Sequence, residues 1–113
     1  MNKGVDLLNQ KKYEESIKYF DKALEIDPEY ALAWCNKGAA LQKLGKYKEA
    51  LKCYEKVTQL DPEDIEAWYK RGQTLEKLGR REEAEESYKR ALEAKPDHEE
   101  AKKAMKRLET DKK

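Results

Sequence analysis

Residues 60–72, LDPEDIEAWYKRG, follow the pattern of residues 26–38, IDPEYALAWCNKG: both contain Asp-Pro-Glu, then Ala-Trp, then a glycine. Trp34 and Trp68 occupy the same place in the two segments. The interval between these tryptophans also separates the three prolines of the chain, Pro28, Pro62 and Pro96. A fixed interval of about 34 residues is typical of stacked repeats, in which each repeat is one supersecondary unit. Residues 1–96 are therefore one unit written almost three times.

Composition favours an elongated array over a spherical domain. The 113 residues are 43% charged and 38% hydrophobic, which leaves little apolar material for one central core. Repeats that each bury a thin face on their neighbours suit this ratio better. Lys and Arg number 25 against 24 Asp and Glu, so the net charge of +1 creates no field that attracts nucleic acid or anionic lipid.

Hydropathy indicates neither a membrane protein nor a secreted one. Mean hydropathy is −1.18, and no apolar run approaches the roughly 20 residues that span a bilayer. The start of the chain, MNKGVDLLNQKKYEE, has no continuous hydrophobic stretch of the signal-peptide type. We therefore expect a cytoplasmic protein with no membrane partner and no nucleic-acid partner.

Within each unit the apolar residues recur at helical spacing. One helix face of the third unit carries Trp68, Gly72, Leu75 and Leu78. After a break at Gly79, which suits a left-handed helix terminus, the pattern restarts with Ala84, Tyr88, Ala91 and Leu92 and ends before Pro96. The second unit repeats this arrangement with its break at Gly45. Each unit is therefore predicted to be two antiparallel helices.

In these positions the sequence resembles the tetratricopeptide repeat (TPR) family, whose pattern is Trp, Leu-Gly, Tyr, Ala, an aromatic residue and Pro. The second and third units match it at Trp34, Gly38, Ala50, Tyr54 and Pro62, and at Trp68, Gly72, Ala84, Tyr88 and Pro96. They depart from it at Lys37 and Arg71, in place of the Leu, and at Leu41 and Leu75, in place of the Tyr. The first unit matches at Gly4, Phe20 and Pro28, has Ser16 in place of the Ala, and lacks the stretch with the Trp.

The resemblance implies one TPR domain over residues 1–113. Its fold class is all-α: an α-solenoid of three helix-turn-helix hairpins in a right-handed superhelix, followed by a capping helix. The repeats are expected at residues 1–30, 31–64 and 65–98, and the capping helix at residues 99–110. The first hairpin is truncated, because its first helix, about Asn2 to Gln10, lacks nearly one turn. Either the chain is a piece of a longer array, or another copy covers this end of the stack, including Leu7, Leu8 and Tyr13.

The tryptophans are expected to be packing residues. Each recurs with its helix register, which is more typical of a packing residue than of a ligand-stacking one. Gly38 and Gly72 have no side chain, so the two helices of a hairpin can approach closely there. The tryptophans, with Tyr54 and Tyr88, would then fill the space around this contact.

The final segment is predicted to be a polar-backed cap. Its apolar residues follow the spacing i, i+3, i+4, i+7 and are Ala101, Ala104, Met105 and Leu108. The basic residues Lys102, Lys103, Lys106 and Arg107 would remain in water. A solenoid needs a terminal repeat of this kind for solubility.

Residues that carry chemistry are nearly absent, so we expect no enzyme, no metal and no cofactor. His98 is the only histidine, in a predicted loop beside Pro96 and Asp97. Cys35 and Cys53 are too far apart in sequence for a zinc or redox motif and are expected to be reduced. No serine or cysteine stands in a nucleophile motif, and no glycine-rich phosphate loop occurs.

The resemblance implies that the first helices of successive hairpins line a groove that receives a peptide or helix of a partner. The residues of these helices that lie off the Trp/Gly/Leu face are the predicted groove residues: Asn2, Val5 and Asn9; Leu32, Cys35, Asn36, Ala39 and Lys43; Glu66, Tyr69, Lys70, Gln73 and Lys77. Val5, Leu32 and Tyr69 are the most informative, since apolar groups off the packing face are what a partner can bury.

Some members of the family bind chaperones by clamping the terminal carboxylate of the partner with Lys, Asn and Arg side chains. Here Asn36 stands at a matching place and Lys70 can replace the Arg. Val5 replaces an Asn, and Glu66 and Met1 replace the two Lys residues. Because Glu66 repels an anion, the sequence disfavours this clamp.

The sequence therefore predicts a non-catalytic interaction module that binds a protein or peptide partner. An alternative from a different class is a structural repeat that forms a homo-oligomer through its exposed ends or by helix swapping. A consensus-like repeat with no specific ligand also remains open. A coiled coil is disfavoured, since a proline recurs in every unit and the apolar pattern holds no heptad.

Overall fold

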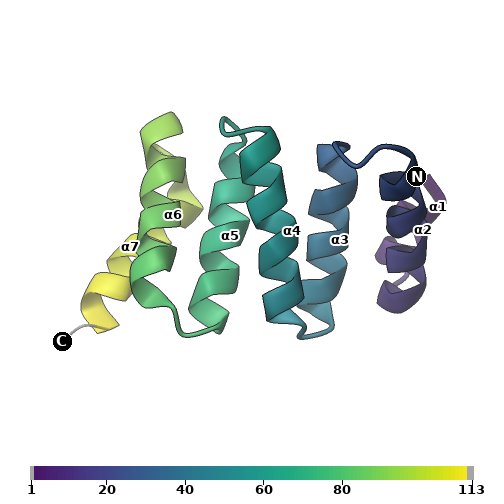
Figure 1. Cartoon of the computed structure of the whole chain (residues 1–113). Helices are drawn as coiled ribbons and strands as arrows, with labels where there is room; N and C mark the ends of the chain where they lie inside the picture. The colour runs from purple at the N-terminus through teal and green to yellow at the C-terminus, as the bar shows by residue number, and fades with distance from the viewer. Residues whose placement is uncertain (1, 112–113) are drawn as a thin grey trace. The chain divides into compact units, whose positions relative to one another are not determined.

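The computed structural model describes residues 2–111, and every regular element within them is an α-helix (Figure 1). The helices are α1 (Asn2–Asn9), α2 (Tyr13–Ile26), α3 (Ala31–Lys43), α4 (Tyr47–Leu60), α5 (Ile65–Lys77), α6 (Arg81–Ala94) and α7 (Glu99–Asp111). The chain divides after Pro62 into two compact units. Unit 1 contains α1 to α4, and unit 2 contains α5 to α7. The predicted helix pairs are confirmed as α1 with α2, α3 with α4, and α5 with α6.

The turn inside each hairpin uses the same backbone conformation. Gly45 and Gly79 have φ of 78° and 76°, in the left-handed region where a residue with a Cβ is strained. Lys11 takes the equivalent place in the first hairpin at φ of 64°. In all three turns the next amide donates back into the helix, to the carbonyls of Leu7, Leu41 and Leu75 at 2.8–2.9 Å. These bonds satisfy carbonyls that a helix end otherwise leaves without a partner.

The connection from one hairpin to the next is set by the residues around each proline. Helices α2, α4 and α6 end just before the Xaa-Pro pairs that begin at Asp27, Asp61 and Lys95. The residue before proline is pushed out of the helical region, and Asp27, Asp61 and Lys95 are extended at φ near −140°. The next helix starts shortly afterwards. At α5 its start is capped by the Asp64 carboxylate, which accepts from the Ala67 amide at 3.1 Å.

Each hairpin closes on a contact between a glycine of its first helix and an aromatic ring of its second. The pairs are Gly4 with Phe20, Gly38 with Tyr54, and Gly72 with Tyr88. All three rings are at most 1% exposed. A Cβ on Gly72 would lie 2.6 Å from the Tyr88 ring, so only a glycine admits the ring at this depth. The predicted close approach at Gly38 and Gly72 is confirmed.

The tryptophans lie outside this contact and are only half-buried. The Trp34 indole N–H donates to the Pro28 carbonyl at 2.7 Å, and the ring packs against the core of α3 and α4. In unit 2, two guanidinium groups lie over the Trp68 ring, that of Arg71 at 5.0 Å and that of Arg90 at 4.6 Å from the ring centroid. At the glycines themselves the nearest side-chain atoms belong to Tyr54, Cys53 and Tyr88, and Trp34 packs farther out against the cluster that contains Tyr54 and Cys53.

Helix α7 packs its apolar stripe on the last hairpin, as predicted. Ala101, Ala104 and Leu108 are at most 5% exposed, and Met105 is half-buried. The basic face of α7 remains exposed to solvent, but Arg107 also binds a protein group. Its guanidinium makes two bonds to the Glu76 carboxylate of α5, at 2.5 and 2.8 Å.

The Glu76 carboxylate joins all three helices of unit 2, since the Tyr88 hydroxyl of α6 also donates to it at 2.5 Å. The Arg107 guanidinium, and then the Tyr88 hydroxyl, hold the pKa of Glu76 below its ordinary value of 4.5, although burial opposes them. Burial and the same carboxylate raise the pKa of Tyr88. We call this set of bonds to the Glu76 carboxylate the Glu76 latch. Tyr88 takes part in the latch through its hydroxyl and also fills the space at Gly72 with its ring.

We expect Gly72→Ala to lower the free energy of unfolding by about 1–2 kcal/mol. Overpacking against a buried ring costs about 1–3 kcal/mol, and the better helix propensity of Ala offsets up to about 1 kcal/mol. Gly38→Ala is the graded comparison, because its methyl meets Tyr54 at 3.0 Å and should cost less. Urea unfolding followed by circular dichroism measures both. Equal stability of Gly72→Ala and the wild type would contradict the role of this contact.

We expect Glu76→Gln to lower the free energy of unfolding at pH 7 by about 1 kcal/mol, a modest value because Arg107 is 54% exposed. The folded pKa of Glu76 is depressed, so its contribution is complete above pH 4.5 and is lost as pH falls through the folded pKa. The difference from wild type should therefore shrink in acid. Thermal unfolding from pH 7 to pH 3 measures it, with exposed Glu109→Gln as control. A stability difference between Glu76→Gln and the wild type that stays constant with pH would contradict a stabilising role of the Glu76 latch.

Candidate functional site

In unit 1, the predicted groove residues of α3 follow one side of the helix. Leu32 is 54% exposed, although it is aliphatic, and Lys43 is exposed near the other end of the helix. Between them Cys35, Asn36 and Ala39 are half-buried. Their spacing places Leu32, Asn36, Ala39 and Lys43 within one strip, since residues three or four apart share a helix face. We call these four residues, together with Cys35, the α3 strip.

Helix α1 adds fewer groups to this surface. Val5 is half-buried and Asn9 is exposed. The side chain of Asn2, also predicted to line the groove, lies outside the described residues, as does Met1. Gly4 and Leu7 of α1 are buried, so this helix uses its other face to close the first hairpin.

In unit 2, His98, which caps α7, contacts two of the predicted groove residues of α5, Glu66 and Tyr69. Tyr69 is only 8% exposed. Its ring lies 5.8 Å from the Tyr88 ring and 5.3 Å from the His98 ring, measured between centroids. Its hydroxyl accepts from the Gln73 amide at 3.0 Å, and burial raises its pKa. The expectation of an apolar ring offered to a partner does not hold at Tyr69, because the ring is part of the packing in unit 2.

Glu66 remains 62% exposed but is fixed by a contact with His98. The Ala101 amide donates to His98 Nδ1 at 3.1 Å, which makes His98 the cap of α7. With Nδ1 accepting, the proton of the neutral ring lies on Nε2, which donates to Glu66 Oε1 at 3.1 Å. The other α5 residues keep access to solvent, since Lys70 and Gln73 are half-buried and Lys77 is exposed.

The role of His98 was missed in the sequence, which places it in a loop. One signal could have found it: the position follows a proline and precedes an amphipathic segment by three residues, where a helix cap is expected. Glu76, also on α5, directs its charge to Arg107 of α7. The acidic character of this part of α5 is therefore partly neutralised by α7.

The two cysteines lie in different environments. Cys53 is 3% exposed in the core of α3 and α4, and burial raises the pKa of its thiol to about 11. Cys35, on the α3 strip, is half-buried, and both residues are present as thiols. A thiol with a pKa as high as that of Cys53 is not a nucleophile at neutral pH.

Across residues 2–111, no three His, Cys, Asp or Glu side chains are grouped so that they could hold a metal ion. The same range contains no helix with the length and hydrophobicity needed to cross a bilayer. The chemical groups of the candidate surface are therefore amides, lysines, carboxylates and one exposed aliphatic side chain. Such groups suit the binding of another polypeptide.

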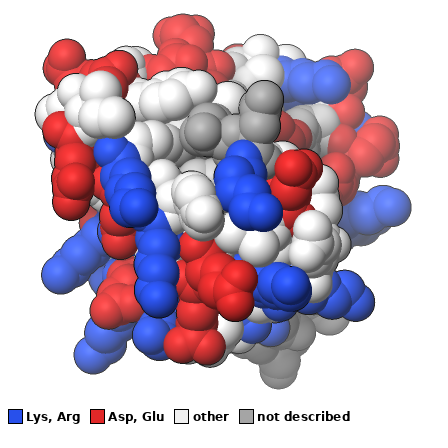
Figure 2. Space-filling view, turned by 90° about the vertical axis from the view of Figure 1, so that its right-hand side faces the viewer, with Lys and Arg blue, Asp and Glu red and all other residues white. Residues whose placement is uncertain are grey.

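Charge on one face of the molecule is mixed (Figure 2). The face that Figure 2 shows, which carries α1 and α2, has basic and acidic side chains next to one another around uncharged areas. No broad area of one sign is visible on this face. A surface of this kind provides short-range complementarity rather than long-range attraction.

Comparison with solved structures finds close agreement in fold. The first TPR domain of Spaghetti (RPAP3), bound to the HSP90 peptide SRMEEVD, is 28% identical, with a TM-score of 0.92 over 96% of this chain and 86% of that one. The second TPR domain of human RPAP3, in complex with the HSP70 peptide SGPTIEEVD, is 26% identical, with a TM-score of 0.91 over 96% and 90%. The TPR domain of Arabidopsis OM64 is 28% identical, with a TM-score of 0.89 over 95% and 88%.

Comparison with family models gives the same answer from sequence. Tetratricopeptide repeat models match residues 31–64 and residues 65–98, and a TPR repeat model matches residues 4–45. No curated protein sequence is similar enough to be matched to the chain. The matched residues cover almost all of the three hairpins, and their helices are those of the structural relatives. The chain belongs to the tetratricopeptide repeat family.

Proposed function

We propose that the chain is a non-catalytic interaction module. It binds a peptide segment of a partner protein on the first helices of its hairpins. Family membership supports this, and two relatives of the same fold hold chaperone peptides. The observation that carries the proposal is Leu32, an aliphatic side chain 54% exposed at the start of the α3 strip. An exposed apolar group flanked by polar ones is typical of a recognition surface.

The rest of the α3 strip supplies complementary groups for a peptide. The Asn36 amide can both donate to and accept from a peptide backbone. Ala39 is small, which lets a bound chain approach the helix, and Lys43 adds a positive charge at the far end. The strip therefore combines an apolar contact, a backbone contact and a charge, a set that favours an extended segment over a small metabolite.

We propose further that this segment is internal rather than a carboxylate terminus. Of the clamp groups, only Asn36 and Lys70 are present, and the Glu66 carboxylate stands where a Lys is needed. The contact of Glu66 with His98 leaves its side chain 62% exposed and able to repel an anion. The peptide SRMEEVD, bound by the first RPAP3 domain, is therefore a negative control for this chain.

End-to-end assembly is the competing proposal. Ile26 is 86% exposed and Tyr30 is 36% exposed in unit 1, and a second copy could cover such groups. Light scattering over a wide range of concentration separates the two proposals. A constant mass near 13.3 kDa favours the free interaction module, whereas a rising mass favours assembly.

We expect Leu32→Ser to weaken the binding of peptides selected on the wild-type chain from a display library by about five- to tenfold. About half of a Leu side chain remains to be buried here, and full burial is worth about 1.5–3 kcal/mol. Isothermal titration calorimetry measures the affinity, and backbone amide shifts in NMR spectra locate the peptide.

The matched control is Ile26→Ser, which removes another exposed aliphatic group that lies off the α3 strip and should leave the affinity unchanged. Equal losses in both variants would contradict the proposal. Selected peptides that leave the backbone amide shifts of α1 and α3 unchanged would also contradict the proposal. Tight binding of SRMEEVD that amidation of its terminus abolishes would contradict the internal-segment part alone.

A further inference from the structure

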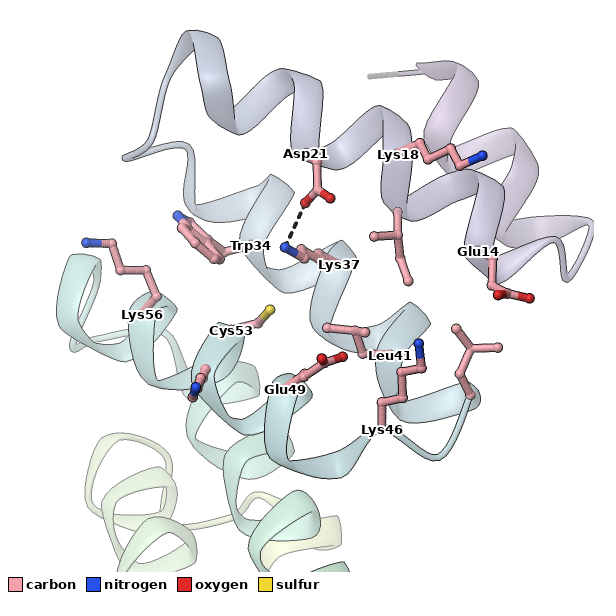
Figure 3. A pocket seen from close by; sticks show the side chains of 13 residues that line it. Glu14, Lys18, Asp21, Trp34, Lys37, Leu41, Lys46, Glu49, Cys53 and Lys56 are labelled. Carbon is pink, nitrogen blue, oxygen red and sulfur yellow. Dashed lines mark ion pairs between the residues drawn. The ribbon is translucent and has the colours of Figure 1, made fainter.

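Unit 1 contains a hollow that the predicted groove residues do not line. Its volume is about 620 Å³, and its walls come from α2, α3, α4 and the turn between α3 and α4. Figure 3 shows Trp34 and Lys56 near one end of this hollow, and Glu14 and Lys46 near the other. We call it the α2–α4 cleft. Its volume lies in the range of about 300–1,000 Å³ that is typical of ligand sites.

The floor of the cleft is apolar. Leu41 and Cys53 are nearly buried there, at 4% and 3% exposed, while Trp34 and Ile17 are half-buried. The indole N–H of Trp34 already has a partner in the Pro28 carbonyl. The part of the ring that lines the cleft is therefore an apolar surface held in a fixed orientation, which is what an apolar side chain of a ligand needs.

Trp34 and its counterpart in unit 2 differ in the cations that lie over their rings. Trp68 stands at the equivalent position of the next repeat, and Arg90 lies 4.6 Å from its ring centroid. The residue equivalent to Arg90 in unit 1 is Lys56, which lines the cleft. Lys37, equivalent to Arg71, lies 5.8 Å from the Trp34 centroid and is tied to Asp21 at 2.7 Å. Trp34 is thus less covered by cations than Trp68.

The rim of the cleft is positively charged. Five lysines and three carboxylates line it, a balance of +2, whereas the whole chain has a net charge of +1. The Asp21–Lys37 pair, drawn in Figure 3, neutralises itself. The remaining lysines are Lys18, Lys46, Lys52 and Lys56, and they face only two carboxylates, Glu14 and Glu49.

We propose that the α2–α4 cleft is a second binding site, which takes a short acidic peptide segment with at least one large apolar side chain. The apolar side chain packs on Trp34 and Leu41, and the carboxylates of the segment pair with the rim lysines. Charge complementarity selects this occupant. Glu14 and Glu49 act against a continuous polyanion such as nucleic acid, because a segment with spaced carboxylates can avoid them and a phosphate backbone cannot.

The probe is a randomised eight-residue peptide library with Asp, Glu, Ser, Leu or Phe at each position, selected on the full wild-type chain. We expect enriched peptides that combine acidic residues with Leu or Phe. In NMR spectra, binding of these peptides should change the backbone amide shifts of α2, α4 and the cleft side of α3. Their affinity should fall as salt rises, because exposed ion pairs are screened.

The decisive variant is Lys18→Glu with Lys52→Glu, which reverses two rim charges and should weaken binding at least about tenfold. The matched control is Lys22→Glu with Lys48→Glu. It makes the same change of net charge on the same two helices, at exposed lysines outside the cleft. Control affinity should stay within about twofold of wild type. Circular dichroism checks that both variants fold.

Trp34 provides a direct readout. The chain has two tryptophans, so Trp68→Phe leaves Trp34 as its only indole. Peptide binding should shift the emission maximum of Trp34 in this variant.

Four results would overturn the proposal. The first is a library that returns no enriched peptide. The second is an equal loss of affinity in both double variants, which would indicate a general charge effect. The third is displacement of the peptide by a single-stranded oligonucleotide of eight thymidines, which would indicate a nucleic-acid site. The fourth is a mass that doubles without peptide while the double variant at Lys18 and Lys52 stays monomeric, which would indicate that a second copy fills the cleft.

Discussion

The contact between a backbone glycine and a buried aromatic ring is the constraint on which the hairpins depend. Gly4, Gly38 and Gly72 bring the first helix of each pair against Phe20, Tyr54 and Tyr88, and no side chain separates them. The buried ring fills the space between the two helices of its hairpin, so these helices have little freedom to slide or rotate against each other. A thin, highly charged repeat can be well packed because this one contact buries a large apolar group in each pair.

The fixed contact leaves the outer positions free to differ between repeats. Trp34 and Trp68 occupy the same place, but Arg90 lies close over Trp68, while its counterpart Lys56 lies at the rim of a cleft. Lys11 adopts the left-handed conformation that Gly45 and Gly79 adopt in the other turns. Such substitutions leave the hairpin geometry unchanged and alter what its surface presents. These variable positions are therefore where the surfaces of the repeats differ.

The capping helix has a larger effect on the candidate site than its composition indicates. Through Arg107 it holds Glu76 of α5, and its cap residue His98 contacts Glu66 and the Tyr69 ring. Two carboxylates and one aromatic ring are thereby taken up by unit 2 itself. In unit 1, by contrast, Leu32 of the α3 strip stays exposed. Of the two apolar side chains Leu32 and Tyr69 that the sequence predicts for a groove, only Leu32, in unit 1, is exposed.

The sequence by itself determined the helices, their pairing and the capping stripe, because these follow from local rules that recur in every hairpin. A left-handed residue ends the first helix, a proline region ends the second, and a glycine of the first helix always faces an aromatic ring of the second. The sequence also predicted that Leu32 lies off the packing face, and its side chain is exposed. Only the tertiary structure decided that Tyr69 is buried, that His98 bonds Glu66, and that a cleft opens beside Trp34. Each of these depends on side chains far apart in the sequence that meet across different helices, and helical periodicity reports only which face a residue occupies, not what covers that face.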